Sequence, residues 1–285
     1  MNTLGVHTFA VASEWRPDIM AAELPRLNAL GVRLVEIPLL RPDELDADAA
    51  RHLASRNSVA LVCSLGLPGR LSVVERPDEA ADFLAHALAV TARAGATSLS
   101  GVPYGTLGYT SGKARTEKEM DAVCRLLERA ARSAKELDLS LGVEPCNRYE
   151  THLLNRAKDA RQVIERIGAD NLFIHLDTYH MNIEEESFEA GFADAGSYLG
   201  YVHLSESNRG VPGRGMIDWA KAMTALAKLG YGGPLVLESF NHLHPDIASS
   251  LAVWRPVADD PKEVLSVGLP FLREAAATAG LNVRQ

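Results

Sequence analysis

The chain has 285 residues, of which 47% are hydrophobic and 23% charged, and its formal net charge at pH 7 is −8. The composition is typical of a soluble globular protein, and the negative charge disfavours nonspecific binding to nucleic-acid phosphates or anionic membranes. No apolar run reaches the roughly 18 residues that a membrane span needs, and the N-terminal residues lack the pattern of a signal peptide. We therefore expect a cytoplasmic protein with no nucleic-acid or membrane partner.

Cysteine usage agrees with a reducing compartment. Cys63, Cys124 and Cys146 are odd in number and far apart, and no CxxC pair occurs. This pattern predicts neither a disulfide framework nor a zinc ribbon. We expect Cys146 to be an inert, packed thiol.

Short apolar runs rich in β-branched residues recur along the chain and predict eight strands. They cover residues 3–9, 32–38, 59–67, 97–103, 139–145, 172–177, 199–205 and 234–240. Helical spacing occupies the segments between them, for example 17–31, 78–95, 117–138 and 219–230. Gly31, Gly95 and Gly230 are expected helix stops, Pro25 is expected to weaken or kink the first helix, and 261–279 should form the last helix after an irregular segment over 241–260.

Regular alternation of strand and helix indicates parallel βαβ units, and eight units in this length predict a single (β/α)8 TIM barrel domain over residues 1–285. A doubly wound open sheet is the alternative. It would normally carry a glycine-rich dinucleotide turn after the first strand, and this sequence has none there.

Four consecutive predicted strands, the fifth to the eighth, end in an ionisable residue. These residues are Glu144, Asp177, His203 and Glu238. In a barrel the carboxyl ends of the strands converge on one mouth, where three carboxylates would repel one another unless a cation neutralised them. Three oxygen donors and one imidazole suit Mn²⁺, Mg²⁺ or Co²⁺, whereas zinc usually takes more nitrogen or sulfur. The alternative, unrelated residues that each cap the next helix, explains one such position better than four in succession.

His175 shares a strand face with Asp177, because side chains alternate with a period of two. It should therefore point into the barrel one layer beneath the mouth. Two roles stay open for it: a partner that holds a metal ligand in place, or a hydrogen-bonded core histidine.

Several of these segments resemble the ketose 3-epimerases, the D-tagatose and D-psicose 3-epimerase group of the xylose-isomerase-like barrels. The likeness rests on GVEPCNRYE (142–150), HLDTYHMNIEE (175–185), HLSESNRGVPGRG (203–215), VLESF (236–240) and AVWRPV (252–257). It implies a TIM barrel with one divalent metal ion, held by Glu144, Asp177, His203 and Glu238.

The resemblance also implies an activity. Glu144 and Glu238 match an acid/base pair on opposite faces of the sugar, which would invert C3 of a ketose through an enediolate. Glu150, His180 and Arg209 match residues that hold the O1 to O3 end. Because the seventh and eighth loops contain no glycine-rich or Lys/Arg-clustered anion site other than Arg209 and Arg214, we expect an unphosphorylated ketose. We also expect a homodimer or homotetramer.

The sequence departs from this family in the first and fourth loops, where aromatic residues are usual. Here those positions hold His7, Thr8 and Leu107. His7 is a candidate substrate-binding residue, although it could instead pair with Glu36. The run HLHP (242–245) lacks helical metal-ligand spacing and is interpreted as a loop over the mouth.

Other activities remain open on the sequence alone. An aldose–ketose isomerase, or a decarboxylase or dehydratase of a sugar acid, would use the same metal site. An abasic-site endonuclease would need additional histidines and a basic groove, and a nonenzymatic sugar-binding barrel would have no use for paired acid/base carboxylates.

Overall fold

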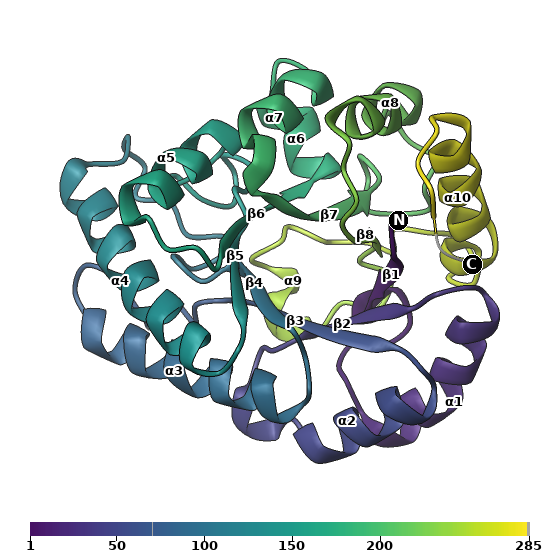
Figure 1. Ribbon diagram of the computed structural model, residues 1–285, viewed down its shortest axis with the longest axis horizontal. Coiled ribbons are helices and arrows are strands. Elements are labelled where there is room, and N and C mark those ends of the chain that lie inside the picture. Colours follow the sequence, from purple (N-terminus) through teal and green to yellow (C-terminus); the bar gives the residue numbers. More distant parts are fainter. Residues whose placement is uncertain (70, 284–285) are drawn as a thin grey trace.

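A computed structural model describes residues 1–69 and 71–283 of the chain. Its eight parallel strands pair in sequence order and close into a barrel, which confirms the predicted TIM barrel and excludes the open sheet (Figure 1). The strands are β1 (Leu4–His7), β2 (Leu34–Pro38), β3 (Ala60–Gly66), β4 (Ser98–Val102), β5 (Ser140–Val143), β6 (Leu172–Asp177), β7 (Leu199–Ser205) and β8 (Leu235–Glu238).

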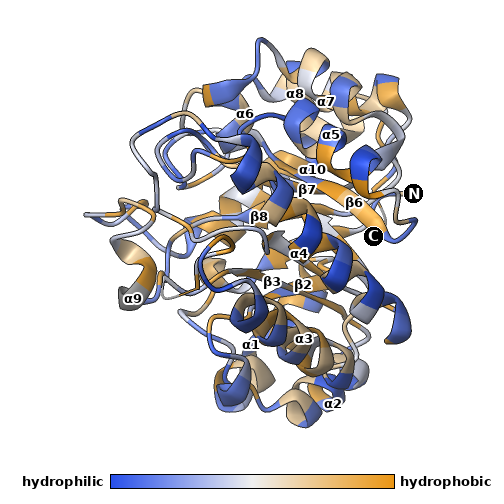
Figure 2. Cartoon of the chain, turned by 90° about the vertical axis from the view of Figure 1, so that its left-hand side faces the viewer, coloured by the Kyte–Doolittle hydropathy of each residue, from blue (hydrophilic) through white to orange (hydrophobic). Residues whose placement is uncertain are grey.

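Helices surround this barrel (Figure 1). The α-helices are α1 (Pro17–Ala29), α2 (Ala47–Arg56), α3 (Pro77–Arg93), α4 (Glu117–Glu136), α5 (Ala157–Ile167), α6 (Thr178–Glu184), α7 (Phe188–Ala195), α8 (Trp219–Leu229), α9 (Pro245–Ala248) and α10 (Leu269–Thr278). Short 3-10 turns cover Thr8–Ala10, Pro42–Glu44 and Gly196–Tyr198. Figure 2 shows largely hydrophobic strands inside and hydrophilic residues on the outward faces of the helices.

Two segments near the C-terminus differ from the sequence prediction. The segment 241–260 was expected to be irregular, but it contains the single turn α9. The predicted helix 261–279 is instead a π-helical turn, Val264–Gly268, followed by α10. Pro270 explains the break, because it has no N–H to donate and its ring would clash with the carbonyl of Ser266 in a regular α-helix.

The other predicted helices are present. α1 continues through Pro25 as one helix, and the expected weakening or kink at this residue stays a prediction. Gly31, Gly95 and Gly230 each follow a helix with positive φ, as expected for helix stops. Within the described residues, no helix combines the length and hydropathy of a membrane span.

Side chains from four strands, Leu34, Val62, Tyr201 and Val236, form a buried cluster, and Phe173 of β6 packs against it. Glycines on both neighbouring strands make room for its ring. A Cβ added to Gly142 would lie 2.6 Å from the ring, and one added to Gly200 would lie 2.7 Å from it. Real Cβ atoms do not approach so closely, so these glycines are required by packing.

We expect Gly200→Ala to lower the free energy of unfolding by about 1–3 kcal/mol, because the extra methyl group overpacks the barrel. Denaturant unfolding of the protein in a chelator measures this change without a metal contribution. Gly232→Ala is the matched control, since its Cβ would meet no atom closer than 3.9 Å. Equal midpoints for the two variants would contradict the packing argument.

Candidate active site and metal centre

The structure brings the four predicted strand-end residues together at one mouth of the barrel. Glu144 directly follows β5, Asp177 ends β6, His203 lies near the end of β7, and Glu238 ends β8. The strand register pairs Asp177 with His203, and Glu238 with Ser205 on β7. All four side chains are buried, with Glu144 the most exposed at 8%.

His203 is the centre of this group. Its Nδ1 lies 3.5 Å from Glu238 Oε1 and 3.8 Å from Glu144 Oε1, yet it makes no hydrogen bond. On the other side of the ring, Nε2 lies 2.6 Å from Oε2 of Glu36. Burial lowers the pKa of His203, but the negative charges of Glu238 and Glu36 outweigh this effect and raise the pKa to about 10. A ligand atom of His203 lies within 4.8 Å of ligand atoms of both Asp177 and Glu238.

Glu144 lies in the least favourable environment for a negative charge. Burial raises the pKa of its carboxyl well above the usual value; His203 opposes this, and the nearby charges of Glu238 and Asp177 add to it. His175 lies beneath it, with Nδ1 3.6 Å from Glu144 Oε2. This agrees with the predicted inward orientation of His175, and the ring also contacts His203 edge-on at a centroid distance of 4.2 Å.

Arg209 supplies the positive charge at the mouth. Its Nη1 donates hydrogen bonds to Asp177 Oδ2 at 2.5 Å and to Glu238 Oε2 at 2.6 Å. The guanidinium is sandwiched between Tyr179, at 3.8 Å from the ring centroid, and Phe240, at 4.4 Å. The backbone of Arg209 has φ of +59°, an uncommon conformation for a residue other than glycine. The loop is therefore shaped to direct this side chain inward.

Glu150 and His180 lie on the same side of the mouth and are joined by Asn147. The amide nitrogen of the Asn147 side chain lies 2.8 Å from Glu150 Oε1 and 2.9 Å from His180 Nδ1, which also accepts a hydrogen bond from the Asn147 backbone. Burial raises the pKa of Glu150 to about 7, and burial together with Arg209 lowers the pKa of His180 to about 3. His180 is therefore a neutral imidazole at physiological pH.

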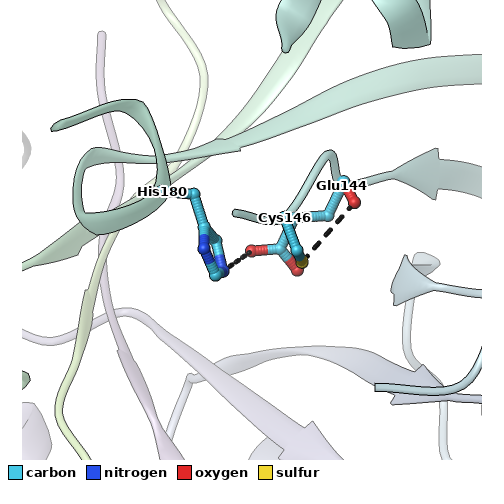
Figure 3. Close-up of side chains that lie close together, drawn as sticks. All are labelled: Glu144, Cys146 and His180. Atoms are coloured by element: carbon cyan, nitrogen blue, oxygen red, sulfur yellow. Dashed lines mark hydrogen bonds and ion pairs between the residues drawn. The ribbon is translucent and has the colours of Figure 1, made fainter. Parts of the chain in front are cut away.

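Cys146 lies against the same group, as Figure 3 shows. Its thiol donates to the backbone oxygen of Glu144 at 3.7 Å, and His180 Nε2 lies 3.9 Å from Glu144 Oε1. Burial raises the pKa of the Cys146 thiol well above its usual value, so the sulfur stays protonated. All three cysteines are free and buried.

His7 lies at the mouth and also faces Glu36. It lines the central cavity, and its Nε2 is 3.7 Å from Glu36 Oε1, which is longer than a hydrogen bond. Its Nδ1 accepts from the backbone of Phe9. His7 therefore lines the cavity, as a substrate-binding residue would, and also lies near Glu36, as a structural partner would. Thr8 points elsewhere, because its hydroxyl donates to the backbone oxygen of Glu36.

The cavity has a polar half and an apolar half. The polar side chains come mainly from the ends of β5 to β8, whereas residues of β2 to β4 and their loops supply mostly apolar atoms. Leu107, Ile247 and Leu251 line the apolar half. In Figure 1 the α9 turn is seen through the ring of strands, and Figure 2 shows it projecting at one end of the barrel. His242, just before this turn, donates its backbone N–H to Phe9, so the segment crosses the mouth as predicted.

Three contributors to the site were not predicted as such. The sequence suggests Glu36 only as a partner for His7 and gives no signal for Asn147. Glu206, fully buried, accepts hydrogen bonds from the backbones of Ser207, Gly213 and Ile217 and from the Trp219 indole, and so shapes the loop that carries Arg209. The sequence does contain a signal for Glu36, because it is a charged residue inside the apolar run LVEIP.

Known proteins resemble this chain over almost its whole length. The xylose isomerase-like TIM barrel family matches residues 24–273. An L-ribulose 3-epimerase from Methylomonas sp. (strain DH-1) is 31% identical over 279 residues, which is 95% of this chain and 96% of that protein. A ketose 3-epimerase from Arthrobacter globiformis is 32% identical over 283 residues, again 95% of this chain and 96% of the relative.

Solved structures extend the similarity to three dimensions. The crystal structure of D-allulose 3-epimerase from Methylomonas sp. in complex with D-allulose has a TM-score of 0.91 and 29% sequence identity, over 96% of this chain and 97% of that one. The family match, the full-length relatives and the shared fold lead to one conclusion. The chain belongs to the xylose isomerase-like TIM barrel family and, within it, to the ketose 3-epimerases.

Proposed function

We propose that this enzyme inverts C3 of an unphosphorylated ketose, using Glu144 and Glu238 as the acid/base pair. The observation that carries the proposal is the position of these two carboxylates. They come from the ends of β5 and β8, and each places an oxygen within 4 Å of His203 Nδ1. Two carboxylates around one centre can remove a proton from one face of a carbon and return a proton to the other.

The donors at this centre fit a divalent metal ion. His203 Nδ1 is buried without a hydrogen-bond partner, and three carboxylates surround it. Three oxygen ligands and one imidazole favour Mn²⁺, with Mg²⁺ or Co²⁺ as alternatives. We propose that Glu144, Asp177, His203 and Glu238 hold the ion. When bound, it would polarise the C2 carbonyl and the C3 hydroxyl of the sugar.

The remaining polar residues would hold the O1 to O3 end of the sugar. Arg209 is charged at any physiological pH and presents several donors in a fixed plane. His180 is neutral and can donate from Nε2, because its Nδ1 accepts from Asn147. Glu150 has an oxygen, Oε2, that is buried without a partner and can accept from a sugar hydroxyl. These three groups lie on the side of β5 to β7, so the far end of the sugar would extend toward β2 to β4.

The apolar half of the cavity favours a sugar without a phosphate. Leu107, Ile247 and Leu251 offer no donor to a phosphate at the far end. Arg209 is already engaged by Asp177 and Glu238, and Arg214 pairs with Glu263. A buried phosphate would therefore lack the charged partners that it needs.

The site supports epimerisation over the alternatives. An aldose–ketose isomerase moves a proton between neighbouring carbons and can work from one face, whereas this site offers two carboxylates, from different strands, around His203 Nδ1. Decarboxylation or dehydration of a sugar acid would need a partner for the substrate carboxylate, and the one arginine among the described lining residues, Arg209, already pairs with Asp177 and Glu238. Manganese, the homodimer or homotetramer and the cytoplasmic location stay predictions.

We expect the enzyme with added Mn²⁺ to convert a free ketose into its C3 epimer, with solvent deuterium appearing at C3 when the reaction runs in D₂O. A panel of free ketohexoses, ketopentoses and ketotetroses, each paired with its phosphate ester, would be compared by chromatography and NMR. The free sugar should have a kcat/KM at least about tenfold above that of its ester. An aldose as the main product would favour the isomerase, and a preference for the ester would contradict the cavity argument.

A further inference from the structure

Glu36 is a buried carboxylate that none of the proposed catalytic steps uses. It lies in the middle of β2, is fully buried, and points into the barrel. There it reaches across the interior to β7, where a single oxygen, Oε2, accepts hydrogen bonds from Tyr201 Oη at 2.7 Å and from His203 Nε2 at 2.6 Å. A buried charge is costly unless it is paired and hydrogen-bonded, and these are the contacts that satisfy it.

The contact with His203 has a consequence for the other ring nitrogen. An ionised carboxylate can only accept, so the proton of this hydrogen bond belongs to Nε2. When a cation displaces the proton of Nδ1, the neutral ring keeps its proton on Nε2 and presents the lone pair of Nδ1 to the space between Glu144 and Glu238, 3.8 and 3.5 Å away. Glu36 thereby selects which nitrogen of His203 is available as a ligand.

Glu36 also helps to fix the orientation of the imidazole ring. The hydrogen bond holds one edge of the ring, while His175 packs edge-on against it with an interplanar angle of 83°. Tyr201 contacts the same ring and shares the Glu36 oxygen. His7 is a weaker partner of Glu36, because its Nε2 lies 3.7 Å from Oε1. The geometry therefore directs Glu36 mainly toward His203.

We propose that Glu36 is a positioning residue for the metal centre, which holds His203 in the tautomer and orientation that present Nδ1 to a divalent cation. The inference rests on the proposed metal site and deepens it. Partners of this kind, which bind the second nitrogen of a ligating histidine, typically change metal affinity or activity by about 10- to 100-fold when they are removed.

The test measures Mn²⁺ binding to the chelator-stripped protein by calorimetry, without any sugar. We expect Glu36→Gln, which keeps the shape but loses the charge, to weaken the affinity about tenfold, and Glu36→Ala to weaken it up to about 100-fold. Tyr201→Phe is the matched control, because it removes the other hydrogen bond to the same oxygen and leaves the His203 contact. It should change the affinity by less than about tenfold, and by less than Glu36→Gln does.

Two further readouts separate positioning from a general effect on the fold. Thermal unfolding of the metal-free variants reports their stability alone. If Glu36 positions His203, Glu36→Gln should bind Mn²⁺ more weakly than Tyr201→Phe even when the two variants unfold at the same temperature. At saturating Mn²⁺ the KM for the sugar should return to the parent value, since Glu36 does not touch the substrate cavity. If Glu36→Ala does not fold, Glu36→Gln decides the question.

Mn²⁺ affinities within about threefold of the parent for the folded Glu36 variants would overturn the inference, since this lies well below the expected range. Failure of the proposed function looks different. If the parent itself binds no divalent ion, the metal site is wrong and the role of Glu36 falls with it. If the parent binds Mn²⁺ and epimerises a ketose while the Glu36 variants bind equally well, only the positioning role is wrong.

Discussion

Glu144→Gln and Glu238→Gln are each expected to lower turnover by about 10²- to 10⁴-fold, the usual contribution of a general acid/base group. Each change also removes an anionic donor from the proposed metal site, so the assay requires saturating Mn²⁺. Because glutamine keeps the shape of the side chain, the loss would reflect proton transfer and charge rather than a collapsed mouth.

The two variants should differ in isotope exchange as well as in rate. Whichever glutamate faces the C3 proton of the supplied epimer is needed to exchange that proton with D₂O. The variant that lacks the other glutamate can still exchange this proton without inverting the carbon. One variant should therefore label its substrate without epimerising it, and the roles should swap when the opposite epimer is supplied. Near-parental epimerisation by both metal-loaded variants would rule out the two-face mechanism.

Asp177→Ala should abolish tight binding of the divalent ion, reducing the metal content from about one ion per chain to near zero. The remaining donors would be two glutamates and one imidazole, and Arg209 would lose one of the two carboxylates that it bridges. Metal analysis after dialysis, together with calorimetry, measures the effect. Undiminished stoichiometry would contradict the assignment of Asp177 as a ligand.

A control is needed because Asp177 also has a structural role. Its Oδ1 accepts from the backbone of Tyr179 and caps the N-terminus of α6, a contact whose loss costs about 1 kcal/mol. Asp177→Asn keeps a good capping residue but loses the charge. If the metal defect appears in Asp177→Asn while the unfolding midpoint of the metal-free protein is retained, the cap is excluded as its cause.

The sequence was sufficient to predict the barrel and the position of its mouth. Both depend on local patterns: the spacing of apolar residues, and the ionisable residue at or near the end of each of the last four strands. In a parallel barrel these local signals also determine the arrangement in space, because all strand ends meet at one mouth. This is why Glu144, Asp177, His203 and Glu238 could be predicted to converge, although their role as metal ligands stays a prediction.

Features that depend on pairing across the barrel were not predictable in the same way. Glu36 and His203 are 167 residues apart, and no local pattern joins them. Arg209 was expected to bind substrate, but its contacts with Asp177 and Glu238 follow from a left-handed backbone and from packing between Tyr179 and Phe240.

The division of the cavity into two halves has an evolutionary consequence. The groups proposed for chemistry lie between residues 144 and 238, whereas the apolar wall comes from earlier loops and from the α9 segment. Leu107 and Leu251 line that wall and touch none of the four proposed metal ligands, so substitutions there would alter the fit of the sugar's far end and leave the carboxylates in place. Substrate range and catalytic power can thus diverge independently within this lineage, since mutations that adapt the barrel to a longer or shorter sugar need not pass through an inactive intermediate.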